Sequence, residues 1–238
     1  KCLPAGRQVM CKAGVMQLCV MKKQFYYTIK HSTSITPYTS NITQNKMIDT
    51  PFPKLKLTVN NVYGECYHGY KAGDEIILED FTHPPKHFCL GLAHALFPVI
   101  YALSFGAKFG FRDNQRSLLV TCPDGGKLEF KAEILDQDGK VETLPKDPNY
   151  KFNPKKMIIE VVQAKGKCTF GYKIGDQWET LGLKCIPGFC GAAFHTAFTA
   201  LFALNFGAKF FFMDNPDSID TVTCPDGGNI VFKVTRVE

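Results

Sequence analysis

One segment of the chain occurs twice. Leu103–Asn114 reads LSFGAKFGFRDN and Leu204–Asn215 reads LNFGAKFFFMDN, which is nine identities in twelve positions. Each segment is followed by the same hexapeptide, TCPDGG, at 121–126 and again at 223–228. Matches of this length, in the same order, indicate an internal duplication. The chain is therefore expected to fold as two modules of about 80 residues, a size at which each module has only a small core.

The residue patterns around the repeat predict the same order of elements in both copies. Each copy has two short runs joined by a glycine-rich turn, then a long apolar run, then two alternating runs joined by Pro-Asp-Gly-Gly, a strong hairpin signal. The expected strands are 55–62, 75–79, 118–121 and 128–134, and then 157–162, 177–181, 221–223 and 230–237. With one helix between the strand pairs, this order predicts an α+β fold. The two strand-strand-helix-strand-strand modules are expected to pack as an intrachain pseudo-twofold dimer.

The expected helices are uncharged over 18 residues, at 88–105 and 189–206. This length reaches the threshold for a membrane span. The histidines His94 and His195, together with Pro98 and the hairpin that follows each run, instead favour helices buried between a sheet and the other module. Gly106 and Gly207 stand where a helix ends in a left-handed residue. No membrane association is expected.

The net charge of +6 is concentrated at the N-terminus. Residues 1–54 hold eight of the 28 Lys and Arg and one of the 22 Asp and Glu. The other 20 basic and 21 acidic residues leave 55–238 with a net charge of −1. The predicted fold therefore lacks the basic surface typical of nucleic-acid binding, and no nucleic-acid partner is expected.

Residues 1–53 differ from the rest of the chain. Their composition is polar and without periodicity, which predicts a disordered or non-native leader, with a start of the working protein at Met47 or at Met21. Module one is assigned to 54–135 and module two to 157–238. The segment 136–156 between them contains three prolines among charged residues and is interpreted as a linker.

Six of the ten cysteines match between the copies: Cys66 with Cys168, Cys89 with Cys190, and Cys122 with Cys224. Cys185 is unmatched, and three more cysteines lie in the leader. Three cysteines per module cannot all pair within that module. This favours reduced thiols or metal ligands, and a cytoplasmic location, over an oxidised secreted scaffold.

Three thiolates and one further ligand would suit zinc or an iron–sulfur cluster. The metal ligands are therefore predicted to be Cys66, Cys89, Cys122, Cys168, Cys190 and Cys224. The obvious fourth ligands are His94 and His195. Cys89 and His94 are five residues apart, which separates them by about 140° around a helix, so they could share a site only if Cys89 precedes the helix.

Other interpretations of these residues stay open. The cysteines could be small hydrophobic core residues, and the histidines hydrogen-bonded core residues, in a non-catalytic module that binds a small ligand or a protein. A nucleophilic Cys89 or Cys190 near a helix N-terminus, with a histidine and Asp124 or Asp226, is a third hypothesis. Asp124 and Asp226 fit turn positions better, so no catalytic residue is assigned.

The spacing of these motifs resembles a family of small bacterial and archaeal proteins of uncharacterised function, catalogued as a TIGR family. The resemblance rests on a cysteine after the first strand, Gly-x-x-x-Gly-Asp, Phe-Cys at the start of the apolar run, and Cys-x-Asp-Gly in the hairpin. It covers 55–134 and 157–238. It implies that the six matched cysteines occupy the family's recurrent cysteine positions, and it implies no activity. The tandem arrangement and the leader depart from that family.

Overall fold

The computed structural model describes residues 52–237, which belong to one compact unit. The expected leader lies outside the described residues except for positions 52 and 53, as do both proposed starts. The first half contains β1 (Leu55–Val62), β2 (Glu75–Leu78), α2 (Leu90–Ser104), β3 (Ser117–Thr121) and β4 (Leu128–Ile134). The second half contains β5 (Lys156–Ala164), β6 (Gln177–Leu181), α3 (Gly191–Asn205), β7 (Ser218–Thr223) and β8 (Ile230–Arg236). The predicted order of elements is confirmed in both halves.

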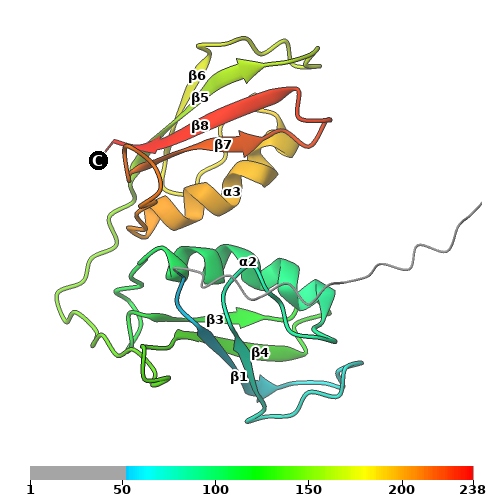
Figure 1. Ribbon diagram of the computed structural model, residues 1–238, viewed down its shortest axis with the longest axis vertical. Coiled ribbons are helices and arrows are strands. Elements are labelled where there is room, and N and C mark those ends of the chain that lie inside the picture. The colour runs from blue at the N-terminus through cyan, green and yellow to red at the C-terminus, as the bar shows by residue number, and fades with distance from the viewer. Residues whose placement is uncertain (1–51, 238) are drawn as a thin grey trace, which may run out of the picture. The chain divides into compact units, whose positions relative to one another are not determined.

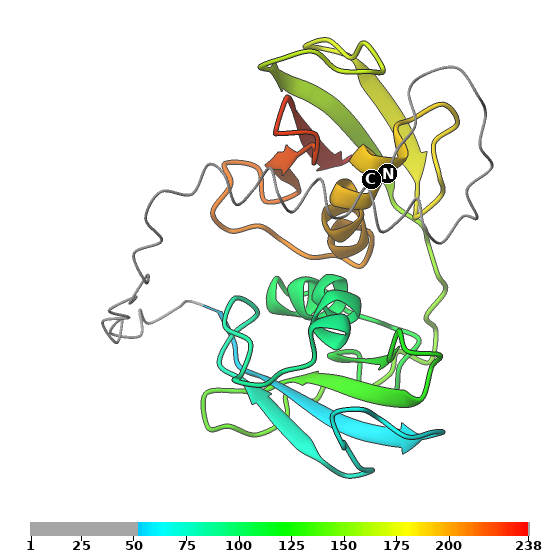
Figure 2. The same ribbon diagram turned by 90° about the vertical axis from the view of Figure 1, so that its right-hand side faces the viewer.

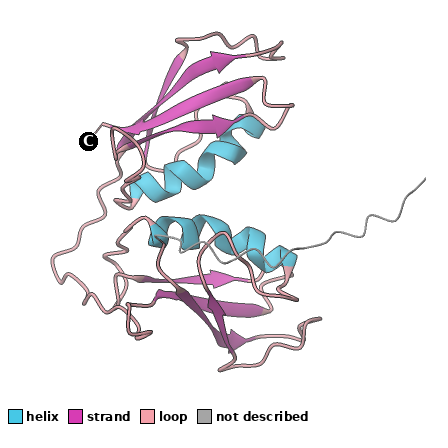
Figure 3. Ribbon diagram, in the orientation of Figure 1, coloured by secondary structure: helices cyan, strands magenta, loops and turns pink. Residues whose placement is uncertain are grey.

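Each half is a four-stranded antiparallel sheet with a helix packed on it (Figures 1 and 3). The strand orders are β2-β1-β4-β3 and β6-β5-β8-β7, so the first and last strands of each half are neighbours at the centre of the sheet. Figure 2 shows from a second direction that α2 and α3 each cover one face of their own sheet. The described residues therefore form an α+β protein with two similar halves.

The central strands alternate as the sequence predicted. Leu55, Leu57 and Val59 of β1 are fully buried beneath α2, and the residues between them reach the other face of the sheet. Both halves carry a β-bulge at the same place, between Val59 and Asn61 in β1 and between Val161 and Gln163 in β5. The bulges end the regular alternation just before the loops that carry Cys66 and Cys168.

The helices are shorter than the apolar runs because the residues at both ends of each run are caps. In α2 the N-cap is Cys89, with extended backbone, and the C-cap is Phe105. Gly106 follows with φ +88, its amide bonds to the Leu103 carbonyl at 3.1 Å, and the Ala107 amide bonds to the Ala102 carbonyl at 3.0 Å. This is the Schellman arrangement. It confirms the predicted terminal glycine, and α3 ends in the same way at Gly207.

The repeated segment also joins the two halves. The Lys108 amide donates to the Phe206 carbonyl at 2.9 Å, and the Lys209 amide donates to the Phe105 carbonyl at 2.8 Å. These four residues occupy two equivalent positions of the repeat, so the contact is reciprocal. Rings from both halves surround it, and helices α2 and α3 pack against each other.

The predicted linker is in part bonded to the first half. The Gln115 amide donates to the Leu144 carbonyl at 2.8 Å, and Asn114 forms a bridge with Pro145. Tyr150 then lies directly on Gly110, where a Cβ would be only 2.1 Å from the tyrosine ring. The segment therefore follows a defined path over the first half. Between positions 52 and 237, no helix is long and apolar enough to cross a membrane.

Candidate functional site

The cysteines that the sequence singled out come from three segments of each half. Cys66 and Cys168 lie in the turn after the first strand, where the amide of the glycine three residues later bonds to the cysteine carbonyl at 2.9 Å. Both glycines, Gly69 and Gly171, have φ +72, a conformation that favours glycine. The turn returns the chain toward the sheet, so that the next residue, Tyr70 or Tyr172, packs against it.

The second cysteine of each half is the N-cap of the helix and the third begins the hairpin. Cys89 therefore precedes α2, which is the condition that the sequence set for a site shared by Cys89 and His94. A Cβ placed at Gly91 would be 3.9 Å from the Cys89 sulfur and 3.4 Å from the Pro123 ring, so the helix start lies against the hairpin. Cys122 is 8 % exposed, and its amide bonds to the Leu128 carbonyl at 2.7 Å. Cys224 is buried in the same way in the second half.

In the second half all three cysteines lie close to Tyr172. Its hydroxyl oxygen accepts a 2.8 Å hydrogen bond from the Cys190 amide. Burial raises the pKa of Tyr172, the hydrogen bond from the Cys190 amide lowers it, and the charges of the Cys190, Cys168 and Cys224 thiolates raise it. The three cysteines are therefore within electrostatic range of the same tyrosine.

In the first half, two of the three cysteines act on the equivalent tyrosine. Burial raises the pKa of Tyr70, the hydrogen bond from the Cys89 amide lowers it, and the charges of Cys89, Cys66 and Asp74 raise it. The pKa of Lys127 is raised mainly by its 2.9 Å hydrogen bond to Asp124, and further by the charges of Cys122 and Cys66. Asp124 is therefore a partner of Lys127 in the hairpin, as the turn interpretation expected.

The buried thiol of the second hairpin is held in its protonated form. Burial raises the pKa of Cys224, and the carboxylate of Asp226 and the thiolate of Cys190 act in the same direction. All seven cysteines between positions 52 and 237 are free thiols. No group of three or more His, Cys, Asp or Glu side chains in the described residues is arranged to hold a metal ion as it stands.

The histidines do not join the cysteines. His94 and His195 are exposed, and their ring centroids are 5.8 Å apart, with the planes at 25° to each other. They line a groove of about 600 Å³ that also contains Phe97 and Phe198. The expectation of buried core histidines was wrong, because they lie on the helix face turned away from their own sheets.

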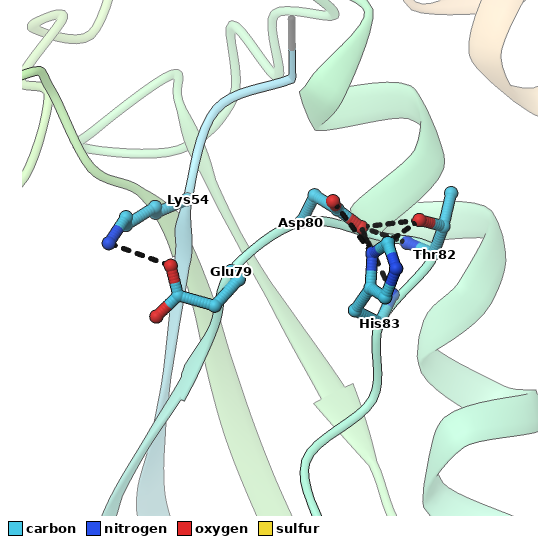
Figure 4. A network of polar contacts seen from close by, with 5 residues as sticks. All are labelled: Lys54, Glu79, Asp80, Thr82 and His83. Carbon is cyan, nitrogen blue, oxygen red and sulfur yellow. Dashed lines mark hydrogen bonds and ion pairs between the residues drawn. The ribbon is translucent and has the colours of Figure 1, made fainter. Parts of the chain in front are cut away.

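Two polar features were missed from the sequence. One is the tyrosine beside the cysteines, Tyr70 or Tyr172, although Gly-Tyr-Lys occurs in both copies and could have drawn attention to it. The other follows β2, where the buried carboxylate of Asp80 accepts hydrogen bonds from Thr82 and His83, including 2.9 Å from the His83 Nδ1 (Figure 4). The adjacent ion pair between Lys54 and Glu79 is 2.7 Å long. This network fixes the turn after β2.

Comparison with protein-family models, with curated proteins and with solved structures found no match. The resemblance to a TIGR family of small proteins therefore stays a prediction.

Proposed function

We propose that each half binds one soft metal centre, zinc or an iron–sulfur cluster, through its three cysteine thiolates. The observation that supports the proposal is Tyr172, which accepts a hydrogen bond from the Cys190 amide at 2.8 Å and whose pKa is raised by burial and then by the charges of all three cysteines of its half. The cysteines come from three separate segments, and in the first half two of the matched cysteines, Cys89 and Cys66, act on the equivalent Tyr70. Thiolates gathered in this way are ligands for zinc and for iron–sulfur clusters.

The proposal requires the cysteine side chains to change their orientation and their protonation when the metal binds. Since no group of three donors among the described residues is arranged for a metal, the sulfur atoms have to rotate inward and lose their protons on binding. Two of the three cysteines in each half are partly exposed and lie in a turn or at a helix cap, positions that allow such rotation. We assign no fourth ligand.

We further propose that the two halves are copies of one module packed as an intrachain pseudo-twofold dimer. The reciprocal bonds between Lys108 and Phe206 and between Lys209 and Phe105 support this, because an isologous interface repeats each contact. Reduced thiols and a cytoplasmic location belong to the same proposal.

The test is metal analysis of the full chain purified without oxygen. We expect two metal equivalents per chain, counted as single ions or as clusters. A variant with Cys66→Ser, Cys89→Ser and Cys122→Ser should lose one, and the variant of Cys168, Cys190 and Cys224 should lose the other. Cys185→Ser removes the exposed, unmatched thiol and serves as the control, together with a variant of the three cysteines at 2, 11 and 19. No metal above background, with every thiol open to titration, would exclude the proposal.

The alternative is a non-catalytic module that binds a small ligand or a protein, with structural cysteines. Burial of Cys122 and Cys224 favours it, because a buried thiol acts as a small hydrophobic side chain. Under this alternative, substituting all six matched cysteines leaves the fold and the affinity for any partner unchanged.

A further inference from the structure

A second candidate site contains no cysteine. It is a pocket of about 390 Å³ where the linker, the end of α3 and the repeated segment of the first half meet. Three lysines line it: Lys108, Lys151 and Lys155. No Asp or Glu is among its lining residues, so the pocket has a local positive charge within a part of the chain that is close to neutral.

A buried amide beside these lysines is only half satisfied. Asn205, the last residue of α3, is 4 % exposed and lines the pocket. Its Oδ1 accepts a hydrogen bond from the Lys155 amide at 3.1 Å, whereas its Nδ2 has no hydrogen-bond partner among the described residues. A buried donor without an acceptor is unfavourable because its lost hydration is not replaced. The site therefore offers a donor that only an added acceptor would satisfy.

The two copies differ where they contribute to this pocket. The repeated segments have three mismatches, and two of them belong here: Asn205 stands opposite Ser104, and Gly110 opposite Phe211. The Ser104 hydroxyl is satisfied by the Ile100 carbonyl at 2.8 Å. Gly110 leaves room for the ring of Tyr150, which positions the linker and its lysine beside the pocket. The counterparts of these two residues, Ser104 and Phe211, provide neither an unpaired buried donor nor room for a ring.

Two carbonyls at the end of α3 have donors from outside the helix. Arg236 Nη1 donates to the Leu204 carbonyl at 2.7 Å, and the Lys108 amide donates to the Phe206 carbonyl. These bonds offset part of the partial negative charge at this helix end. Rings complete the wall: Phe152, which is 55 % exposed, lies 6.1 Å from Phe206.

We propose that this pocket binds a small aromatic oxyanion, whose carboxylate or phosphate group meets the lysines and Asn205 Nδ2 while its ring packs on Phe152 and Phe206. Lysine ammonium groups and an amide N–H are donors that such a group accepts. The pocket is of the size that holds a compact molecule. This inference does not depend on the proposed metal sites.

The test is an NMR titration of the full chain with benzoate and with phenyl phosphate at constant ionic strength. We expect saturable shifts of the Asn205 side-chain amide and of the Gly207 backbone amide. The two probes distinguish a carboxylate ligand from a phosphate ligand. Benzamide has the same ring and no charge, and it should bind at least about tenfold more weakly.

Two variants test the residues. Asn205→Ser installs the residue that the first half already has at this position, and the double variant Lys151→Gln, Lys155→Gln removes two charges. Each should weaken binding by about tenfold. Lys209→Gln is the matched control, because Lys209 is the counterpart of Lys108 and is already paired with Asp217. The inference is overturned if neither probe gives saturable shifts, if benzamide binds as well as benzoate, or if Lys209→Gln has the same effect as the pocket variants.

Discussion

The hydroxyl oxygen of Tyr172 accepts a 2.8 Å hydrogen bond from the backbone amide of Cys190, the N-cap of α3. The bond ties the turn after β5 to the start of the helix, which are the segments that carry two of the three cysteines in this half. Tyr172→Phe removes the hydroxyl and keeps the ring that packs on Trp178 at 4.6 Å. We expect it to lower the free energy of unfolding by about 1 kcal/mol, measured with urea. Tyr67→Phe is the control, because Tyr67 is 96 % exposed; an equal effect would contradict the role of the bond.

The proposed metal sites should depend on pH. A metal displaces the proton of each thiol that binds it, so affinity rises with pH by up to about tenfold per thiol and per pH unit below the thiol pKa. Burial raises the pKa of Cys224, and its proton is therefore displaced less readily. In the variant that keeps only the second site, cobalt or zinc affinity should increase steadily from neutral to alkaline pH. An affinity independent of pH would show that thiols are not the ligands.

Gly110 should tolerate no side chain while Tyr150 is present. A Cβ at Gly110 would lie 2.1 Å from the tyrosine ring, so Gly110→Ala must displace the ring, at a cost of about 1–3 kcal/mol in chemical unfolding. Combined with Tyr150→Ala, the same change should cost little more than Tyr150→Ala alone. Gly191→Ala is the matched control, because a Cβ there meets nothing within 4 Å. Additive effects of the two changes would contradict the contact.

Tyr101 should make the protein sensitive to alkali. Burial raises its pKa from 10.0 to about 12. The unfolded chain therefore loses this proton first, and the stabilisation is present below about pH 10 and is lost as the pH rises toward about 12. Tyr101→Phe should reduce the loss of stability over that range, measured by urea unfolding at a series of pH values. An unchanged pH profile would contradict the assignment.

The residue before Phe-Cys has a left-handed backbone in both halves. It is His87 with φ 62 in the first half and Gly188 with φ 73 in the second. A non-glycine residue in this conformation costs about 1–2 kcal/mol, more than the 0.5–1 kcal/mol of extra entropy that glycine loses. We expect His87→Gly to stabilise the chain by about 0.5 kcal/mol and Gly188→Ala to destabilise it by about 1 kcal/mol. Thermal unfolding measures both. Destabilisation by His87→Gly, or stabilisation by Gly188→Ala, would refute the backbone argument.

Much of the fold could be predicted because its signals are local. Alternation placed β1 and β4 at their observed bounds, and the glycine after each apolar run marked the end of each helix. The start of β7 was placed three residues late, because the bulge between Ile219 and Val222 breaks its alternation. Helix starts were also misplaced, since Cys89 and Cys190 are uncharged residues that continue the apolar pattern while serving as N-caps.

The candidate sites were less predictable because they depend on contacts between distant segments. The matched cysteines identified which residues to follow, but not the tyrosine beside them. His94 and His195 were considered as fourth ligands of separate cysteine sets. Their rings instead stack on each other, one from α2 and one from α3. The half-satisfied Asn205 is one of the three mismatches of the repeated segment, but a lone asparagine at the end of an apolar helix does not by itself indicate a binding site.

Because Tyr150 lies on Gly110, equivalent positions of the two repeated segments have different neighbouring residues. Tyr150 of the linker lies on Gly110, whereas Phe211 lies against Phe52, so changes at these two equivalent positions act in different surroundings although their sequence contexts match. Effects of substitutions measured in one half therefore cannot be transferred to the other by alignment. A chain that carries the same segment twice thus has two copies that are constrained by different neighbours.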